Sequence, residues 1–258
     1  MPGPDLPGLN VLVTRPPAQA TRLSTAIRQM GGNPIALPLL DICPLPPTTQ
    51  IKQALAQLDQ VDFLIFVSAN AVMFGLPYLA EIPASLLVGA IGQATAERLR
   101  AAGIHAELVP TQFDSEGLLA LPQLQALQGK AVLIVRGKGG REKLAESMRA
   151  RGARVRYVEV YRRACPRWTE SDVHTAQRAD VITVTSSEAL ENLAQLAKLP
   201  GGEVLWAKPL LVFHDRIAGR ARELGFTLKA VVTEQPSDDA LLMALAHWTN
   251  VQKGMEHS

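Results

Sequence analysis

Short apolar runs alternate with amphipathic stretches along most of the chain. The runs are rich in Val, Ile and Leu and are bounded by polar residues or glycine. They cover residues 11–14, 63–67, 86–91, 131–135, 181–185 and 210–213. Runs of this length suit strands that are covered on both faces of a parallel sheet, although periodicity alone does not exclude a helix. We predict a strand at each of them.

The stretches between these runs carry helical periodicity. Glycine directly follows four such stretches, which cover residues 20–30, 94–102, 142–151 and 217–224. A glycine just past the end of a helix readily adopts the left-handed conformation that closes the last turn. Strand, helix and glycine in repeated succession indicate parallel βα units, and therefore an α/β protein.

The second half of the chain resembles the first. GLNVLVTRP from Gly8 resembles GKAVLIVRG from Gly129, at an offset of 121 residues (129 − 8). VDFLIFVSANAV from Val61 resembles ADVITVTSSEAL from Ala179, at an offset of 118 residues (179 − 61). This period is too long for a solenoid repeat. It predicts two α/β domains of one design.

Two proline-bearing stretches, residues 37–49 and 157–168, interrupt the alternation of strands and helices. Their prolines restrict them to extended or edge geometry. If both stretches cross between the domains, the first domain is discontinuous. The expected layout is residues 1–39 with 166–258 in domain 1, residues 45–158 in domain 2, and linkers at about 39–45 and 157–166. A simple split near residue 127 is the alternative.

Composition argues against a nucleic-acid-binding, a secreted and a membrane-spanning protein. The 258 residues carry 26 basic and 24 acidic side chains, without the basic excess of a duplex-binding protein, so we expect no nucleic-acid partner. The N-terminus lacks the features of a secretory signal, and no apolar run is long enough to span a bilayer. The two cysteines are too few for a disulfide framework. We expect a reduced, cytoplasmic protein without membrane contact.

Arginine ends two of the predicted strands at matched places of the repeat, Arg15 and Arg136. Ligands of open parallel sheets bind outside the carboxyl ends of the strands, so both side chains could contact a ligand. Pairing with a nearby acid is the alternative for each. The loop RGKGGRE, residues 136–142, adds Arg141, but it matches neither the Walker loop nor GxGxxG. It is either a basic ligand-binding loop or a solvated one.

Short polar turns separate several predicted strands from the helices that follow. The candidate ligand-binding residues of these turns are Ser68, Ala69, Asn70, Gly92, Thr95, Ser115, Thr185, Ser186 and Ser187. Serine and threonine at such places are commonly helix N-caps. The same geometry turns backbone N–H groups and the positive end of the helix dipole toward an anion such as a carboxylate. A cap and an anion site are compatible here.

Tyr161, in EVYRRACP, is the candidate for acid catalysis. If its segment bridges two domains, its phenol faces the space between them and can donate a proton to a leaving oxygen. Packing against the linker is the alternative. The five histidines form no cluster, so we predict no metal site. The chain also lacks the GxSxG elbow of serine hydrolases.

Taken in order, the motifs of the chain resemble those of the uroporphyrinogen-III synthase family. They run from VLVTRPPAQA through FVSANAV, AIGQATAERL, SEGLL, VYRR and VTSSEALENL to the closing PSDDALLMAL. The resemblance implies two flavodoxin-like α/β domains with parallel sheets, joined by a two-strand antiparallel linker. One domain would be assembled from both ends of the chain.

The resemblance also implies a reaction. Hydroxymethylbilane, a linear tetrapyrrole with eight carboxylates, would lose its hydroxyl as water and close with ring D inverted, giving uroporphyrinogen III. No cofactor or metal is implied. The family's tyrosine corresponds to Tyr161, which would assist departure of the hydroxyl. We expect a monomer that accepts its substrate from hydroxymethylbilane synthase.

The resemblance also assigns binding residues, and one of the matching turns departs from the family's pattern. The serine of the family's FTS turn corresponds to Ser68, the threonine of its GxxTA turn to Thr95, and its later Ser-rich turn to residues 185–187. The matching turn in the last third of the chain departs from the pattern. It reads HDRIA from His214, without glycine or threonine, and Arg216 could supply a cation there instead.

Two other functions compete with this enzyme. The first is a cytosolic two-domain module that binds or senses a small anionic ligand without catalysis. The second, a Rossmann oxidoreductase, lacks its glycine fingerprint.

Overall fold

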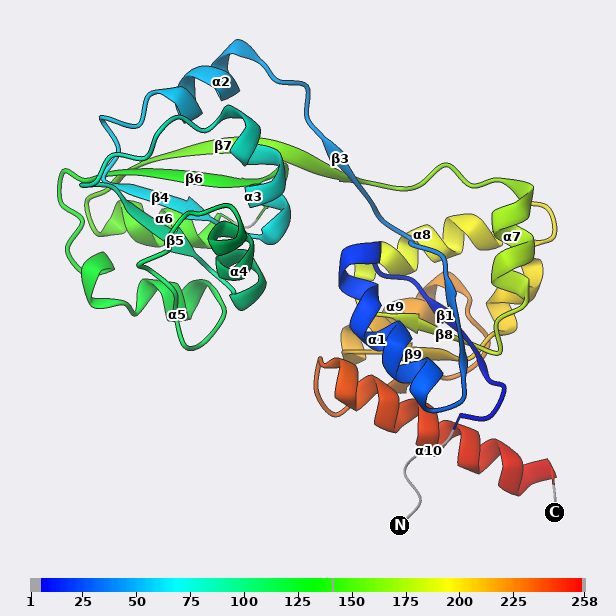
Figure 1. Ribbon diagram of the computed structural model, residues 1–258. Coiled ribbons are helices and arrows are strands. Elements are labelled where there is room, and N and C mark those ends of the chain that lie inside the picture. The colour runs from blue at the N-terminus through cyan, green and yellow to red at the C-terminus, as the bar shows by residue number, and fades with distance from the viewer. Residues whose placement is uncertain (1–5, 141, 257–258) are drawn as a thin grey trace. The chain divides into compact units, whose positions relative to one another are not determined.

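Two five-stranded sheets organise residues 6–140 and 142–256, which the computed structural model describes (Figure 1). The chain accordingly divides into two units. Unit 1 comprises Met1–Asp41 and Ala164–Ser258, and unit 2 comprises Ile42–Arg163. The α/β class with two largely parallel sheets, predicted from the alternating pattern, is confirmed.

The sheet of unit 1 is parallel at every strand pair. Its strands are, in spatial order, β10 (Val231–Val232), β9 (Leu210–Val212), β8 (Val181–Val184), β1 (Asn10–Val13) and β2 (Asn33–Ala36). Successive side chains of a strand point to opposite faces, and here both faces are covered. The predicted runs at 11–14, 181–185 and 210–213 are therefore strands of this sheet.

Helices cover both faces of this sheet. They are α1 (Pro17–Gln29), α7 (Glu170–Gln177), α8 (Ser187–Ala197), α9 (Asp215–Leu224) and α10 (Asp238–Glu256), with the 3-10 helix η3 (Gly202–Ala207). Val11 and Val13 pack in one core with residues of α1 and α10. Leu12 packs in the other core with residues of α7, α8 and α9. Alternate side chains of β1 therefore pack into two separate cores, one on each face of the sheet.

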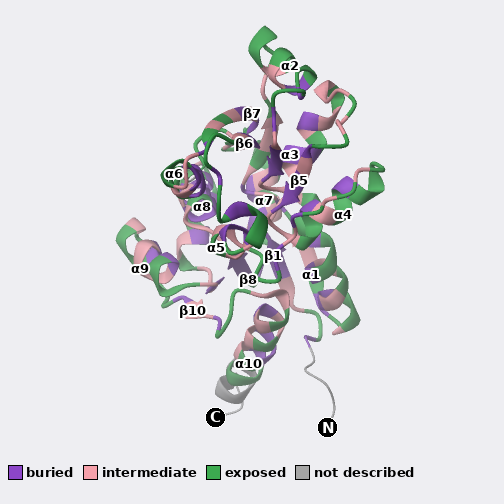
Figure 2. Cartoon of the chain, turned by 90° about the vertical axis from the view of Figure 1, so that its left-hand side faces the viewer, coloured by how far each residue is buried: buried purple, intermediate pink, exposed green. Residues whose placement is uncertain are grey.

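Unit 2 repeats this plan. Its sheet contains, in spatial order, β3 (Asp41–Pro44), β7 (Arg154–Ala164), β6 (Ala131–Gly137), β4 (Phe63–Phe66) and β5 (Leu87–Ala90). Its helices are α2 (Thr49–Ala56), α3 (Ala69–Gly75), α4 (Gln93–Ala101), α5 (Ser115–Leu119) and α6 (Lys143–Ala150), with the 3-10 helices η1 (Leu76–Tyr78) and η2 (Pro122–Leu124). Residues of α2, α3 and α4 join the core on one face, and residues of α5 and α6 join the core on the other. Exposed residues mark the outer sides of helices such as α1 and α2 in Figure 2.

The repeat extends to individual hydrogen bonds. Asp180 Oδ2 accepts from the N–H of Asn10, the first residue of β1, at 2.8 Å. Asp62 Oδ2 accepts from the N–H of Ala131, the first residue of β6, also at 2.8 Å. Each carboxylate stands just before the neighbouring strand, β8 or β4, and holds the start of the strand beside it. The two units therefore share a construction, as the sequence repeat predicts.

Candidate functional site

A cavity of about 470 Å³ lies in unit 2 at the carboxyl ends of β4 and β6. Four residues predicted from the sequence line it, and each comes from a different element: Ser68, Ser115, Arg136 and Tyr161. This is the edge of a parallel sheet where ligands bind, because the turns after the strands present backbone and side-chain groups there. The cavity is therefore the candidate site.

Tyr161, on β7, is only 5% exposed. Its hydroxyl lies 3.0 Å from Ser68 Oγ, and its ring packs against Phe74 with the centroids 6.0 Å apart. Ser68 is also the N-cap of α3, since its Oγ accepts from the Ala71 N–H at 3.1 Å. The phenol is thus held at the cavity wall by a serine that is itself fixed to a helix.

Gly137 makes room for the phenol. The register between β6 and β7 shifts at this point, so that Arg136 lies opposite Glu159 and Gly137 lies opposite Tyr161. A Cβ atom on Gly137 would lie 2.5 Å from Cζ of the tyrosine ring. The φ angle of Gly137 is not among the positive ones, so contact with the ring, and not backbone strain, requires glycine here.

Arg136 is 6% exposed and engaged by its neighbours. Its Nη2 lies 2.8 Å from Glu142 Oε1 and 3.2 Å from Glu159 Oε1, and its guanidinium lies 3.8 Å from the centroid of the Tyr157 ring. Burial lowers the pKa of Arg136, but the hydrogen bonds to the two glutamates outweigh it and the pKa rises. The arginine lines the cavity and also pairs with acids beside it, which is the alternative that the sequence left open for this residue.

Tyr157 and Glu142 complete this network. The Tyr157 hydroxyl donates to Glu142 Oε2 at 2.7 Å. Burial, and then this hydrogen bond, raise the pKa of Tyr157 to about 12. The same hydrogen bond, followed by that from Arg136, lowers the pKa of Glu142. The phenol therefore stays neutral and the carboxylate stays charged at neutral pH.

The turn before α5 adds acidic groups to the cavity wall. Asp114 Oδ1 accepts from the Gly117 N–H at 2.7 Å and caps α5. This bond, and then one from Gln112, lower the pKa of Asp114. A Cβ on Gly117 would lie 2.0 Å from the Gln112 carbonyl oxygen, so only glycine fits there. Glu116, which also lines the cavity, pairs with Lys143.

The other predicted residues of unit 2 do not all reach this cavity. Ala69 and Asn70 occupy the first turn of α3, Gly92 is the N-cap of α4, and Thr95 is buried in its first turn. These four are not among the lining residues. Arg141 lies outside the described residues.

In unit 1 the predicted residues lie at the carboxyl ends of β1, β8 and β9. Arg15 hydrogen-bonds Asp238 at 2.5 Å and lies 5.0 Å from the centroid of the Phe213 ring. Ser186 caps α8 by accepting from the Ala189 N–H at 3.1 Å, between Thr185 and Ser187. Arg216 is exposed in the first turn of α9, beside the turn that departs from the family pattern.

Sequence analysis missed Tyr157, Glu142 and Glu159. The one signal for Tyr157 and Glu159 is that they share β7 with the candidate tyrosine. Strand alternation does not group all three, because the register shift beside Tyr161 places its side chain in one core with Val160, while Tyr157 packs against the other core. Glu142 carries no comparable signal, since only its contacts with Arg136 and Tyr157 set it apart.

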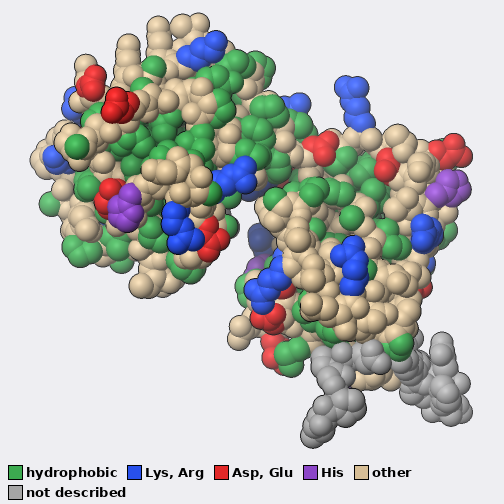
Figure 3. Space-filling model, in the orientation of Figure 1, with side chains coloured by type: hydrophobic (Ala, Val, Ile, Leu, Met, Phe, Trp, Pro, Cys, Tyr) green, Lys and Arg blue, Asp and Glu red, His purple; other side chains and the backbone are tan. Residues whose placement is uncertain are grey.

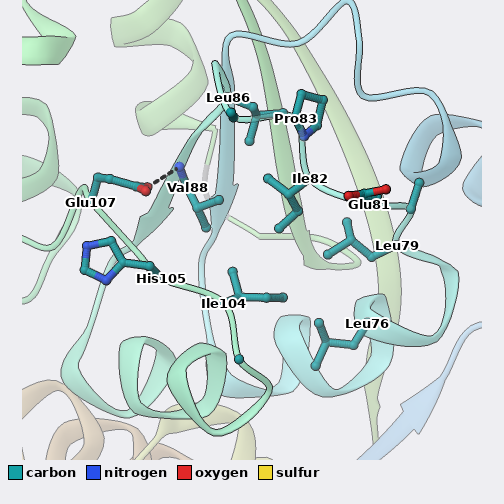
Figure 4. Close-up of a pocket in the computed structure, with 13 residues that line it drawn as sticks. Leu76, Leu79, Glu81, Ile82, Pro83, Leu86, Val88, Ile104, His105 and Glu107 are labelled. Carbon is teal, nitrogen blue, oxygen red and sulfur yellow. Dashed lines mark hydrogen bonds between the residues drawn. The ribbon is translucent and has the colours of Figure 1, made fainter.

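A second cavity, of about 480 Å³, lies beside β5 in unit 2 (Figure 4). Its wall combines apolar side chains such as Leu79 and Ile82 with Glu81, His105 and Glu107, and none of the residues predicted from the sequence lines it. Glu107 reaches the backbone N–H of Val88 at 2.9 Å, as the dashed line in Figure 4 marks. Two glutamates and no lysine or arginine are among its described lining residues, so this cavity does not match a ligand rich in carboxylates.

Within the residues that the structure describes, no three His, Cys, Asp or Glu side chains gather as a metal site would need. No described helix combines the length and the apolar character needed to cross a membrane. Cys43 and Cys165 are free thiols. On the face drawn in Figure 3, basic and acidic side chains are interspersed.

Comparison with known proteins shows which family this sequence matches. A family model described as uroporphyrinogen-III synthase HemD matches residues 21–243. Uroporphyrinogen-III synthase of Escherichia coli (strain K12) is 34% identical over 247 residues, covering 92% of this chain and 100% of that protein. The synthase of Synechococcus elongatus is 32% identical over 264 residues, covering 93% of this chain and 96% of its own.

Solved structures agree in fold. Uroporphyrinogen-III synthetase from Helicobacter pylori 26695 superposes with a TM-score of 0.62 at 18% identity, covering 93% of this chain and 99% of that one. A mutant uroporphyrinogen III synthase from the extremely thermophilic bacterium Thermus thermophilus gives a TM-score of 0.54 at 18% identity, covering 97% and 100%. At these identities the likeness concerns the fold alone.

Proposed function

The chain belongs to the uroporphyrinogen-III synthase family of tetrapyrrole biosynthesis, and from this premise we propose that it closes hydroxymethylbilane to uroporphyrinogen III with inversion of ring D. The observation that carries the proposal within the molecule is the Tyr161 phenol on the wall of the unit 2 cavity, hydrogen-bonded to Ser68. A phenol that borders a cavity can donate a proton to a leaving oxygen.

In the proposed reaction the hydroxyl of the substrate leaves as water. Tyr161 donates a proton to that oxygen as the C–O bond breaks, and the terminal ring then inverts through a spiro intermediate before the macrocycle closes. The chemistry needs positioning more than a strong nucleophile, because the substrate supplies both reacting ends. This requirement agrees with a site that contains a phenol, ordered turns and one buried arginine network.

Recognition of the carboxylates is the second part of the proposal. Lys138 is exposed and lines the cavity, and Ser115 stands at the start of α5 on the same wall. Asp114 and Glu116 are acidic neighbours that repel a carboxylate, so the basic side of the cavity selects the orientation of the substrate. Each exposed contact between an anion and a cation or helix end is worth about 0.3–1 kcal/mol, so several must act together.

We propose that the enzyme acts as a monomer in the cytoplasm and that it accepts hydroxymethylbilane from hydroxymethylbilane synthase. Two free cysteines support a reducing compartment. Sedimentation of the purified protein, alone and with that synthase, tests the monomer and the handover.

One assay tests the reaction. Purified protein is incubated with freshly made hydroxymethylbilane, and the product isomers are oxidised and resolved by chromatography. We expect the type III isomer to dominate and its yield to rise with protein concentration. If the type I ring that forms spontaneously still dominates at high protein concentration, the chain binds its ligand without this catalysis.

A further inference from the structure

The hydrogen bond between Ser68 Oγ and Tyr161 Oη, 3.0 Å long, can in principle run in either direction. A serine hydroxyl carries one proton and two lone pairs, and a phenol can also donate and accept. Ser68 Oγ already accepts from the Ala71 N–H at 3.1 Å. Among the described residues, the Ser68 proton has no acceptor other than the phenol oxygen.

We propose that Ser68 donates to the Tyr161 oxygen and thereby leaves the phenolic proton directed into the cavity. This inference rests on the proposed function. Ser68 is then a positioning residue that acts through Tyr161, in addition to capping α3. If the direction were reversed, the phenol would donate its hydrogen bond to Ser68 Oγ, and its proton would not be directed at a leaving oxygen.

The donor also helps the proton transfer itself. As the substrate C–O bond breaks, its electron pair stays on the departing oxygen, which takes the phenolic proton and leaves as water. The phenolate that results keeps the hydrogen bond from Ser68, and a hydrogen bond to the charged form favours that form. The methylene cation that remains bonds to the substituted α-carbon of ring D and forms the spiro intermediate. The old bond between ring D and its neighbouring methylene then breaks, that methylene bonds to the free α-carbon of ring D, and the proton of this carbon returns to the phenolate.

Gly137 is the second positioning residue in this inference. The ring of Tyr161 lies against the backbone of Gly137, where any Cβ would approach to 2.5 Å, and it packs against Phe74 as well. The phenol is buried and cannot move aside freely. A methyl group at position 137 therefore displaces the hydroxyl from Ser68 while the tyrosine stays in the chain.

A double-mutant cycle tests both residues. The variants are Ser68→Ala, Ser68→Thr, Gly137→Ala and Tyr161→Phe, together with Ser68→Ala and Gly137→Ala in the Tyr161→Phe background. We expect Ser68→Ala to lower kcat about three- to tenfold at unchanged KM, since one hydrogen bond is lost. Gly137→Ala should lower kcat roughly 10- to 100-fold, as far as loss of the phenol does. Ser68→Thr, which keeps the hydroxyl, should restore activity.

The Tyr161→Phe background distinguishes action through the phenol from an independent role. There we expect Ser68→Ala and Gly137→Ala each to change kcat less than about twofold, because no phenol remains to be positioned. Thr48→Ala is the matched control for cap loss. Thr48 caps α2 in the same unit by accepting from the Ile51 N–H at 3.2 Å, and its removal should leave kcat unchanged.

Three outcomes would overturn the inference. Equal fractional losses in the wild-type and Tyr161→Phe backgrounds would show that Ser68 and Gly137 act independently of the phenol. A loss in Ser68→Thr as large as in Ser68→Ala would show that the hydroxyl is not what matters. A wild-type protein that forms only the type I isomer would instead refute the proposed function, and the donor role with it.

Discussion

Each unit has an arginine that follows or ends a strand of its sheet, but the residues that hold this arginine differ between the two units. In unit 1, Arg15 pairs with Asp238 at the start of α10 and lies over Phe213. In unit 2, Arg136 pairs with Glu142 and Glu159 and lies over Tyr157. Each arginine thus combines an aromatic face with carboxylates. The recurrence indicates a structural device that holds the turn after a central strand.

The units differ where the chemistry is proposed. The offset of 121 residues that matches Arg15 with Arg136 (136 − 15) also matches Leu40 with Tyr161 (161 − 40) and Pro16 with Gly137 (137 − 16). Leu40 packs against a core of unit 1, where it offers no hydroxyl. The repeat therefore supplies the scaffold twice, and the phenol with its glycine occurs at this place in unit 2 alone.

The strand-tip arginines give the largest expected effect. We expect Arg136→Met to lower the free energy of unfolding by about 3 kcal/mol, because two carboxylates lose a buried cation. Arg15→Met should cost about 2 kcal/mol, since Asp238 stands at a helix N-terminus whose dipole still stabilises its charge. Urea unfolding at pH 7 measures both.

A different outcome would break the comparison. Suppose that Arg136→Met has the same free energy of unfolding as the wild type and a higher KM for hydroxymethylbilane. Arg136 would then bind substrate, and the two arginines would have different roles. Arg22→Met is the control, because Arg22 pairs with Asp239 where both side chains are more than 70% exposed. A pair of this kind contributes about 0–1 kcal/mol.

The phenol gives the next effect. Tyr161→Phe should lower kcat roughly 10- to 100-fold, somewhat below the usual general-acid range because water can substitute in part. Tyr78→Phe is the matched control, since Tyr78 packs beside the same core of unit 2 but does not line the cavity. Steady-state rates of uroporphyrinogen III formation compare the two. Equal rates for Tyr161→Phe and wild type would reduce Tyr161 to a packing residue.

Much of the fold could be predicted from the sequence because burial on both faces leaves continuous apolar runs, as in Phe63–Phe66. β2 and β10 escaped prediction, one because it contains Pro34 and the other because it has two residues. The first helix begins at Pro17 and not at residue 20, since proline is well suited to the first turn.

The site was less accessible to sequence reasoning. Tyr161 and Ser68 are separated by 93 residues, and their hydrogen bond depends on β4 and β7 both flanking β6. The contact of Gly137 with the phenol depends on a local shift in strand register, which no periodicity encodes. Asp238 is 223 residues from Arg15, so nothing in the local pattern links them.

Tyr157 allows the network of unit 2 to be tested by pH. Its pKa of about 12 in the folded protein lies above the ordinary value of 10, so its stabilising contribution is complete below pH 10 and is lost as pH rises toward 12. We expect the wild type to lose about 1–2 kcal/mol more than Tyr157→Phe over this range, after allowance for partial exposure. Urea unfolding of both proteins between pH 9 and 12 measures the difference. Parallel curves would mean that the phenol ionises equally in both states.

The matched aspartates at the strand starts give the smallest effect and the most direct test of the repeat. Asp62→Ala and Asp180→Ala should each lower the free energy of unfolding by about 1 kcal/mol at pH 7, because each removes one hydrogen bond to a strand N–H. The N–H of Ala131, followed by Lys130, lowers the pKa of Asp62 below 3.8. Its contribution is therefore complete above the ordinary pKa and is lost as pH falls further. Urea unfolding at pH 7 and pH 3 should show the Asp62→Ala deficit shrinking. Asp62 also pairs with Lys130 at 2.8 Å, an exposed ion pair worth about 0–1 kcal/mol. Deficits at pH 7 that differ by more than this amount would mean that the two units share a sequence pattern but not the energetics of this hydrogen bond.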